Sequence, residues 1–302
     1  MTFTTQIKEE ITKEENNNIE DLTSLCTYLK FNATLEEDKM TVMVVNASVA
    51  RWIFKLLKTN YNVLIKLTTR TMKRFKARNL YILEVKEKLD LIYKDIDNIF
   101  KEINTSSDEE KKAFLKGMFL ACGSINDPKK NQYHLEFLVK EEEDAKLIDD
   151  LLNSLKIKSK VLKRDREYMV YVKSSENISD FIKYLGAFNA LFYFEDIRIY
   201  KDHKNMVNRL NNCEQANVER TLKSSKTILD NIKYLEDNDL LMLLDDRSKE
   251  IIEYKKKYPD TSLGELAEII TMETNKSITK SGINHHFRKI NALVKKAKEN
   301  HE

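Results

Sequence analysis

One basic segment near the C-terminus holds the side chains best suited to contact a nucleic acid. Between Asn275 and Lys298 the chain has seven lysines and arginines and no acidic residue. Arginine pairs with guanine edges, asparagine with adenine edges, and serine with a base or a phosphate, whereas lysine mainly contacts phosphate. The residues expected to face double-stranded DNA are Lys280, Ser281, Asn284, His285, Arg288, Lys289, Lys295 and Lys296. The alternative interpretation is a solvated basic face on a small helical bundle.

Two short helices are expected to position these side chains. Ser262 and Glu265 have the spacing of a capping box at the start of the first helix. Thr279 is a good N-cap for the second helix. Its apolar stripe would be Ile283, Phe287, Ile290 and Leu293 or Val294. Because Pro259 disfavours helix at the preceding residue, the segment is bounded there, and the pattern predicts a helix-turn-helix.

Residues 113–125, AFLKGMFLACGSI, form a second segment with a chemically meaningful layout. Gly117 and Ala121 are four apart, so they share a helix face on which a second backbone can approach closely. Gly123 is expected to take a positive φ where the helix turns into a strand. The layout resembles the LAGLIDADG motif of homing endonucleases, in which an acidic residue just before the last glycine holds the catalytic metal.

The positions that match those metal-binding acids are Asn32 in a first copy of the motif and Cys122 in the second. Amide and thiol groups are poor ligands for Mg²⁺, which prefers charged oxygen ligands. His285 and His286 are adjacent, so they point to different helix faces and cannot chelate one metal together. We therefore expect no catalysis, no cofactor and no bound metal, with Asn32 and Cys122 as vestigial positions.

The elements before the basic segment repeat at a spacing of about 90 residues. The expected fold class is α+β: a duplicated LAGLIDADG-like N-terminal domain of two αββαββα repeats, followed by an all-α helix-turn-helix domain. The predicted divisions are a first repeat over 1–105, a second over 106–202, a helical linker over 203–245 and the helix-turn-helix domain over 246–302.

The predicted hairpins of both repeats are basic. Residues 51–83 include nine lysines and arginines and no acid, and residues 156–173 include seven with two acids. In a LAGLIDADG fold these hairpins form a saddle on DNA, so they are candidates for backbone contacts without cleavage. The candidates are Lys66, Arg70, Lys73, Arg74, Lys76, Arg78, Lys163, Arg164 and Arg166. A solubilising or protein-binding face is the alternative.

The composition agrees with a protein that carries real hydrophobic cores. The 302 residues are 41% hydrophobic and 33% charged, with a net charge of +3, which by itself is weak evidence for nucleic-acid binding. The three cysteines lie far apart without a CxxC pair, which favours reduced thiols. The polar N-terminal stretch is not expected to be a signal peptide, and no run reaches the roughly 18 apolar residues of a membrane span. We expect a cytoplasmic protein.

Several blocks of the chain, in order, resemble the WhiA family of bacterial transcriptional regulators and cell-division factors. They are residues 114–137, 178–199, 207–221 and 278–290. The resemblance implies DNA binding, transcription regulation, cell division and chromosome segregation, and sporulation where the host sporulates, with RNA polymerase or other transcription factors as further partners. It also implies a sigma-region-like helix-turn-helix domain and a nucleoid-associated monomer. The chain departs from the family at His286, where arginine is usual, and at Thr271–Lys276, where missing prolines predict a looser turn.

Two alternatives to a DNA-binding regulator stay open. One is a protein-interaction scaffold for the division machinery or RNA polymerase, with weak DNA binding. The other is a residual homing-type endonuclease.

Overall fold

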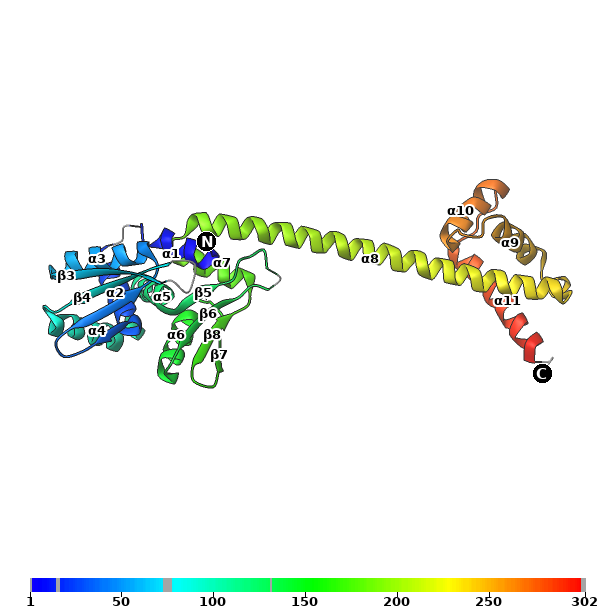
Figure 1. Cartoon of the computed structure of the whole chain (residues 1–302). Helices are drawn as coiled ribbons and strands as arrows, with labels where there is room; N and C mark the ends of the chain where they lie inside the picture. The colour runs from blue at the N-terminus through cyan, green and yellow to red at the C-terminus, as the bar shows by residue number, and fades with distance from the viewer. Residues whose placement is uncertain (1, 15–16, 73–77, 131, 300–302) are drawn as a thin grey trace. The chain divides into compact units, whose positions relative to one another are not determined.

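The computed structural model describes residues 2–14, 17–72, 78–130 and 132–299 (Figure 1). By their internal contacts the residues divide into two compact units, 1–202 and 203–302. Unit one contains both repeats, and unit two contains the C-terminal helices.

The two repeats of unit one have the same order of elements. The first consists of α2 (Asn18–Asn32), β1 (Ala33–Leu35), β2 (Met40–Val44), α3 (Ala47–Tyr61), β3 (Ile65–Met72), β4 (Arg78–Val85) and α4 (Leu89–Glu102). After a 3-10 turn at Ile103–Thr105, the second consists of α5 (Asp108–Cys122), β5 (Gly123–Ile125), β6 (Leu135–Val139), α6 (Glu142–Ser154), β7 (Lys160–Lys163), β8 (Tyr168–Val172) and α7 (Ser175–Tyr184). Both sheets are antiparallel, with strand orders β1-β2-β4-β3 and β5-β6-β8-β7. The predicted αββαββα duplication is confirmed.

Helices α2 and α5 pack directly against each other at the centre of unit one. The Ser24 hydroxyl on α2 donates to the Ala113 carbonyl on α5 at 2.9 Å, and the Asn32 amide donates to the Ala121 carbonyl at 3.1 Å. Both bonds join residues 89 positions apart, so they link equivalent places in the two repeats. A Cβ on Gly117 would lie 2.4 Å from the Ser24 carbonyl oxygen, which confirms that a small residue is required there.

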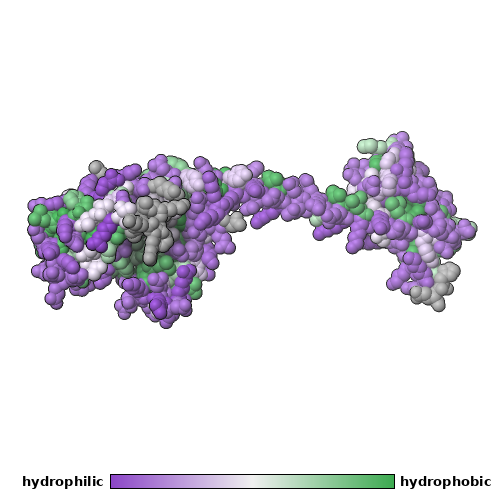
Figure 2. Space-filling view, viewed as in Figure 1, coloured by the Kyte–Doolittle hydropathy of each residue, from purple (hydrophilic) through white to green (hydrophobic). Residues whose placement is uncertain are grey.

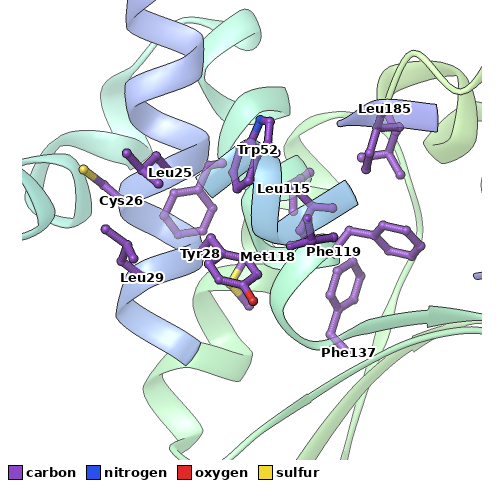
Figure 3. Close-up of a cluster of buried hydrophobic side chains, with 14 of the residues drawn as sticks. Leu25, Cys26, Tyr28, Leu29, Trp52, Leu115, Met118, Phe119, Phe137 and Leu185 are labelled. Atoms are coloured by element: carbon purple, nitrogen blue, oxygen red, sulfur yellow. The ribbon is translucent and has the colours of Figure 1, made fainter. Parts of the chain in front are cut away.

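The core of unit one surrounds this helix pair. In Figure 3, Leu25, Tyr28 and Leu29 of α2 gather with Leu115, Met118 and Phe119 of α5 in one apolar cluster. The sheets contribute their helix-facing side chains, such as Phe137 of β6. Burial of these large side chains is the main driving force for the fold.

Gly123 differs from the sequence-based expectation. Its φ is −82°, in the extended region that any residue can adopt, and not in the left-handed region. Glycine is needed here because a Cβ would lie 2.3 Å from the Phe119 ring. The glycine therefore serves side-chain packing and not a special backbone angle.

An N-terminal helix, α1 (Phe3–Ile11), was not anticipated from the sequence. Its Phe3, Ile7 and Ile11 side chains are buried. The Thr4 hydroxyl accepts from the Ile125 amide at 3.0 Å and donates to the Ile125 carbonyl at 2.8 Å. The Glu10 carboxylate accepts from the backbone amides at the start of helix α8, those of Asn189 (2.7 Å) and Ala190 (3.1 Å). The first helix of the chain thus completes the second repeat.

Unit two is built from helices around its own core. Helix α8 (Phe188–Asp237) begins in unit one and ends in unit two. It is followed by a 3-10 turn at Leu240–Leu243, α9 (Asp246–Lys257), α10 (Leu263–Thr274) and α11 (Lys280–Glu299). Ile228, Ile232 and Leu235 of α8 are buried in this core. The C-terminal part of the segment predicted as a helical linker, 203–245, therefore contributes core residues to unit two.

The surfaces of both units are mainly polar. Figure 2 shows hydrophilic side chains over most of the visible face of each unit, with hydrophobic side chains in small patches. Within the described residues, no helix combines the length and apolar character needed to cross a membrane.

Candidate nucleic-acid interface

Helices α10 and α11 form the predicted helix-turn-helix, and their ends are set by side-chain caps. At the start of α10, the Ser262 hydroxyl accepts from the Glu265 amide (3.3 Å) while the Glu265 carboxylate accepts from the Ser262 amide (2.7 Å). At the start of α11, the Thr279 hydroxyl accepts from the Gly282 amide at 3.1 Å. Each cap satisfies donors that the first helical turn leaves free. The predicted capping residues are confirmed.

The turn between these helices is held by a threonine. The Thr271 hydroxyl accepts from the Ile278 amide at 3.2 Å and donates to the Ile278 carbonyl at 3.4 Å. Asn275 ends α10 in the left-handed conformation, with φ 53°. The expected looser turn is therefore wrong, because the Thr271 side chain closes the loop in the absence of proline.

The apolar stripe of α11 fixes which of its faces meets solvent. Ile283, Phe287, Ile290 and Val294 are buried in the core of unit two, and Leu293 is half-buried. The opposite face is polar. Lys280, Ser281, His285 and Arg288 are exposed, and Asn284 is half-buried. The helix thus brings the five predicted base-reading residues to its first turns.

The three lysines that are predicted to contact phosphate differ in their ion pairs. Lys289 is exposed, but its ammonium lies 3.6 Å from the Asp245 carboxylate at the start of α9. Lys295 lies 3.8 Å from the Glu299 carboxylate, and Lys296 is exposed near the end of α11. Surface ion pairs of this kind contribute little, about 0–1 kcal/mol, so both lysines can exchange their partner for a phosphate.

Asp245 was not predicted from the sequence, and it links α9 to α11. It caps α9 through the Ser248 amide at 2.7 Å, and it faces both Lys289 and His286. His286 is half-buried, with its Nδ1 2.8 Å from the Ser248 hydroxyl. Burial lowers the pKa of His286, with Asp245 opposing the effect. The signal in the sequence was the helix-capping pattern Asp245–Ser248.

In unit one, the two vestigial positions lie at the ends of the paired helices and are engaged internally. The Asn32 amide donates to the Ala121 carbonyl, and the Cys122 thiol donates to the Met118 carbonyl at 3.4 Å. Burial raises the pKa of Cys122 to about 12, so it is a neutral thiol. The Lys8 ammonium donates to the Leu120 carbonyl at 3.1 Å, and burial lowers its pKa to about 8. An amide, a thiol and an ammonium are a poor donor set for a divalent cation.

The described residues contain no group of three or more histidine, cysteine or acidic side chains placed to hold a metal. Asp127, the nearest acid after the second motif helix, accepts instead from the Lys129 amide at 2.9 Å.

The two hairpins differ in how they present their basic residues. Lys66 and Arg70 are exposed on β3, and Lys66 lies 3.1 Å from Glu84 on the neighbouring strand. Arg164 and Arg166 are exposed in the β7–β8 turn. In the strand register, Lys163 lies opposite Tyr168, and Tyr168 lies opposite the buried Val139. Lys163 is therefore on the helix-covered face of its sheet, although its own side chain is exposed. Lys73, Arg74 and Lys76 lie outside the described residues, as does the side chain of Arg78.

A duplicated αββαββα scaffold with altered metal positions, joined to a capped helix-turn-helix, defines a bipartite protein with a degenerate LAGLIDADG-like part. Three family models match: the WhiA N-terminal LAGLIDADG-like domain at residues 19–99, the WhiA LAGLIDADG-like domain at 111–204 and the WhiA C-terminal HTH domain at 207–294. The chain belongs to the WhiA family.

Similar proteins and structures agree with this assignment. The chain is 36% identical to a probable cell division protein WhiA of Oceanobacillus iheyensis, over 99% of this chain and 98% of the relative. It is 38% identical to one from Bacillus cytotoxicus, over 98% and 97%. The crystal structure of full-length WhiA from Thermatoga maritima matches with a TM-score of 0.60 at 21% identity, covering 98% of this chain and 99% of that one.

Proposed function

We propose that this protein is a DNA-binding transcription regulator of cell division that reads double-stranded DNA through the first turns of α11. The observation that carries the proposal is the exposed polar face of that helix, where Ser281 is exposed and Lys280 and Arg288 have no ion-pair partner among the described residues. The relatives carry the name probable cell division protein WhiA, which supports the biological setting.

In this proposal α11 enters the major groove, with Asn284 and Arg288 one helical turn apart on the polar face. Arg288 would donate two hydrogen bonds to a guanine, and Asn284 would pair with an adenine. Lys295 and Lys296 would contact the backbone further along. Asp245 would release Lys289 when a phosphate arrives, because the ion pair between them is exposed and contributes little.

The test is the double substitution Asn284→Ala with Arg288→Ala in the full chain. Selection from a randomised duplex pool should give a defined site for the wild type and a relaxed one for the variant, since each good base contact contributes about 1–3 kcal/mol of discrimination. Asn205 and Arg209 on α8 have the same types and spacing and are also exposed, so Asn205→Ala with Arg209→Ala is a matched control. An unchanged preference in the first variant would remove these residues from the reading role.

We also propose that the hairpins of unit one touch the DNA backbone without cutting it, through Lys66, Arg70, Arg164 and Arg166. The pairing of Lys66 with Glu84 makes this surface less positive than its sequence suggests. Reversing the charges of Arg70, Lys73 and Arg74 should flatten the dependence of binding on salt, whereas reversing the exposed Lys55, Lys94 and Lys101 should not. An unchanged slope in the first variant would mean that this surface does not bind.

The two competing functions have separate tests. Full cellular function after removal of residues 259–302 would favour a scaffold for the division machinery or RNA polymerase over a DNA reader. A plasmid-nicking assay with Mg²⁺ or Mn²⁺ tests residual cleavage, which we expect to be absent because Asn32 and Cys122 supply no carboxylate. Roles in chromosome segregation or sporulation, and a nucleoid location, follow from this proposal as expectations for the cell.

A further inference from the structure

A cavity of about 180 Å³ opens on unit two, where α8, the start of α10 and the start of α11 meet. Helix α8 contributes Arg220, Ser224 and Ser225 to its wall, and the other two helices contribute Ser262 and Lys280. Among the residues lining the cavity, none is acidic. The lining is therefore rich in cations and hydroxyl groups, which are the groups that bind oxyanions.

The floor of this cavity is supported by a buried ammonium group. Lys255 on α9 is fully buried, and no ion pair to a carboxylate is found for it within the part of the chain that the structure describes. Its ammonium donates to the Ser225 hydroxyl at 2.8 Å and to the Thr261 carbonyl at 2.7 Å, and both acceptors line the cavity. Burial lowers the pKa of Lys255, while Asp260 and Glu265 raise it.

Ser225 connects this buried charge to the cavity. Its side chain is 5% exposed, and its oxygen accepts the bond from Lys255. A hydroxyl that accepts one bond keeps its own proton to donate. No acceptor for that proton is found among the described residues. Ser225 can therefore donate into the cavity, with the positive charge of Lys255 polarising it.

Two further cations stand at the mouth of the cavity. Arg220 and Lys280 are exposed, and neither has an ion-pair partner among the residues that the structure describes. Glu265, which is three residues from the lining residue Ser262, is engaged by the Ser262 amide. A purely structural role of Lys255 explains its two bonds but not the two free cations and the free hydroxyl of Ser224 on the same cavity.

We propose that this cavity binds one phosphoryl oxyanion, with Arg220, Ser225 and Lys280 as its donors. The favoured source is a backbone phosphate of DNA, because Lys280 belongs both to the cavity and to the first turn of α11. Because DNA is taken as the source of the phosphate, the inference rests on the proposed function. It also extends the DNA surface from the helix-turn-helix onto α8, within the block at residues 207–221.

The experiment uses the full chain and compares Arg220→Gln with Arg209→Gln, an exposed arginine on the same helix that does not line the cavity. Affinity for specific and non-specific duplexes is measured across a salt series. Arg220→Gln should reduce the slope of log K against log[salt] by about 0.9, the value for one lost phosphate contact on duplex DNA. The slope of Arg209→Gln should remain that of the wild type, and circular dichroism checks that both variants are folded.

A second arm distinguishes DNA from a free anion as the source. The thermal midpoint of each protein is compared in inorganic phosphate and in chloride at equal ionic strength, without DNA. Ser225→Ala is included because it keeps both exposed cations and removes only the buried donor. General salting effects of phosphate act on all variants alike, so only the difference from the wild type counts.

The outcomes separate cleanly. A reduced slope supports the site with DNA phosphate as its ligand. An unchanged slope with a phosphate-dependent rise in midpoint that Arg220→Gln and Ser225→Ala both lose supports the site with a free anion as its ligand. If neither the change in slope nor the phosphate-dependent rise in midpoint is observed, the inference is overturned. Failure of the proposed function is different: it would show as sequence preference that does not depend on Asn284 and Arg288, whatever Arg220 does.

Discussion

At the scale of single residues, the two positions that match the metal-binding acids are both engaged inside the protein. Asn32 bridges from α2 to a carbonyl of α5, and the Cys122 thiol is bonded within its own helix. Lys8 adds a positive charge at the same helix end. Both the Asn32 and the Cys122 side chains therefore have hydrogen-bond partners within the protein itself.

The three cysteines should differ sharply in reactivity. Cys213 is exposed, whereas Cys26 is buried and Cys122 is half-buried. Burial raises the pKa of both Cys26 and Cys122 to about 12. Because the thiolate is the reactive form, a disulfide reagent should label one thiol in the native protein and the other two only on unfolding. Cys213→Ser should abolish the native reaction. Rapid native labelling of Cys122 would contradict this account of the helix end.

His286 should make unit two less stable in mild acid. Its pKa is lowered in the folded state, so the unfolded chain binds the proton more readily. Stability should therefore fall as the pH drops below about 6.5, the ordinary histidine value, until the folded pKa is passed. Urea unfolding at pH 7.5 and 5.5 should show a smaller loss for His286→Gln than for the wild type. The exposed His203→Gln should behave like the wild type, and equal losses in all three proteins would count against the assignment.

At the scale of elements, the fit between α2 and α5 depends on Gly117. A Cβ there would lie 2.4 Å from the Ser24 oxygen and 2.8 Å from the Thr27 Cβ, so the helices would have to separate. Gly117→Val should destabilise unit one by about 1–3 kcal/mol or more, the usual effect of overpacking. Chemical denaturation measures this. Gly264→Ala on α10, where the nearest atom is 3.8 Å away, should cause no loss.

The elements also show what could be predicted from sequence. Helices such as α5 and α11 follow from apolar spacing and caps, and both are where the patterns place them. Helix α1 was not predicted because its three buried residues are spaced four apart within a polar, charged stretch. The φ of Gly123 and the burial of His286 depend on Phe119 and Ser248, which are contacts with other turns and helices. Local patterns carry no information about such contacts.

At the scale of the whole molecule, the chain has two separate hydrophobic cores, and each stabilises its own unit. The buried residues of unit one and those of unit two form distinct clusters. We therefore expect two calorimetric transitions, of which Gly117→Val lowers only one and a core change such as Phe287→Ala lowers only the other. The latter should cost about 3–5 kcal/mol. A single transition shifted equally by both changes would show that the cores are energetically coupled.

The docking of α1 has a consequence for synthesis of the chain on the ribosome. This helix emerges before both repeats, yet Thr4 bonds to Ile125 and the Phe3 ring lies 6.3 Å from that of Phe194. Helix α3 of the first repeat can contact it early, but its contacts with α5, β5 and Phe194 form only after most of the two repeats has been translated. A nascent chain arrested before residue 123 should expose Phe3, Ile7 and Ile11 to chaperones, and one arrested well beyond residue 194 should not.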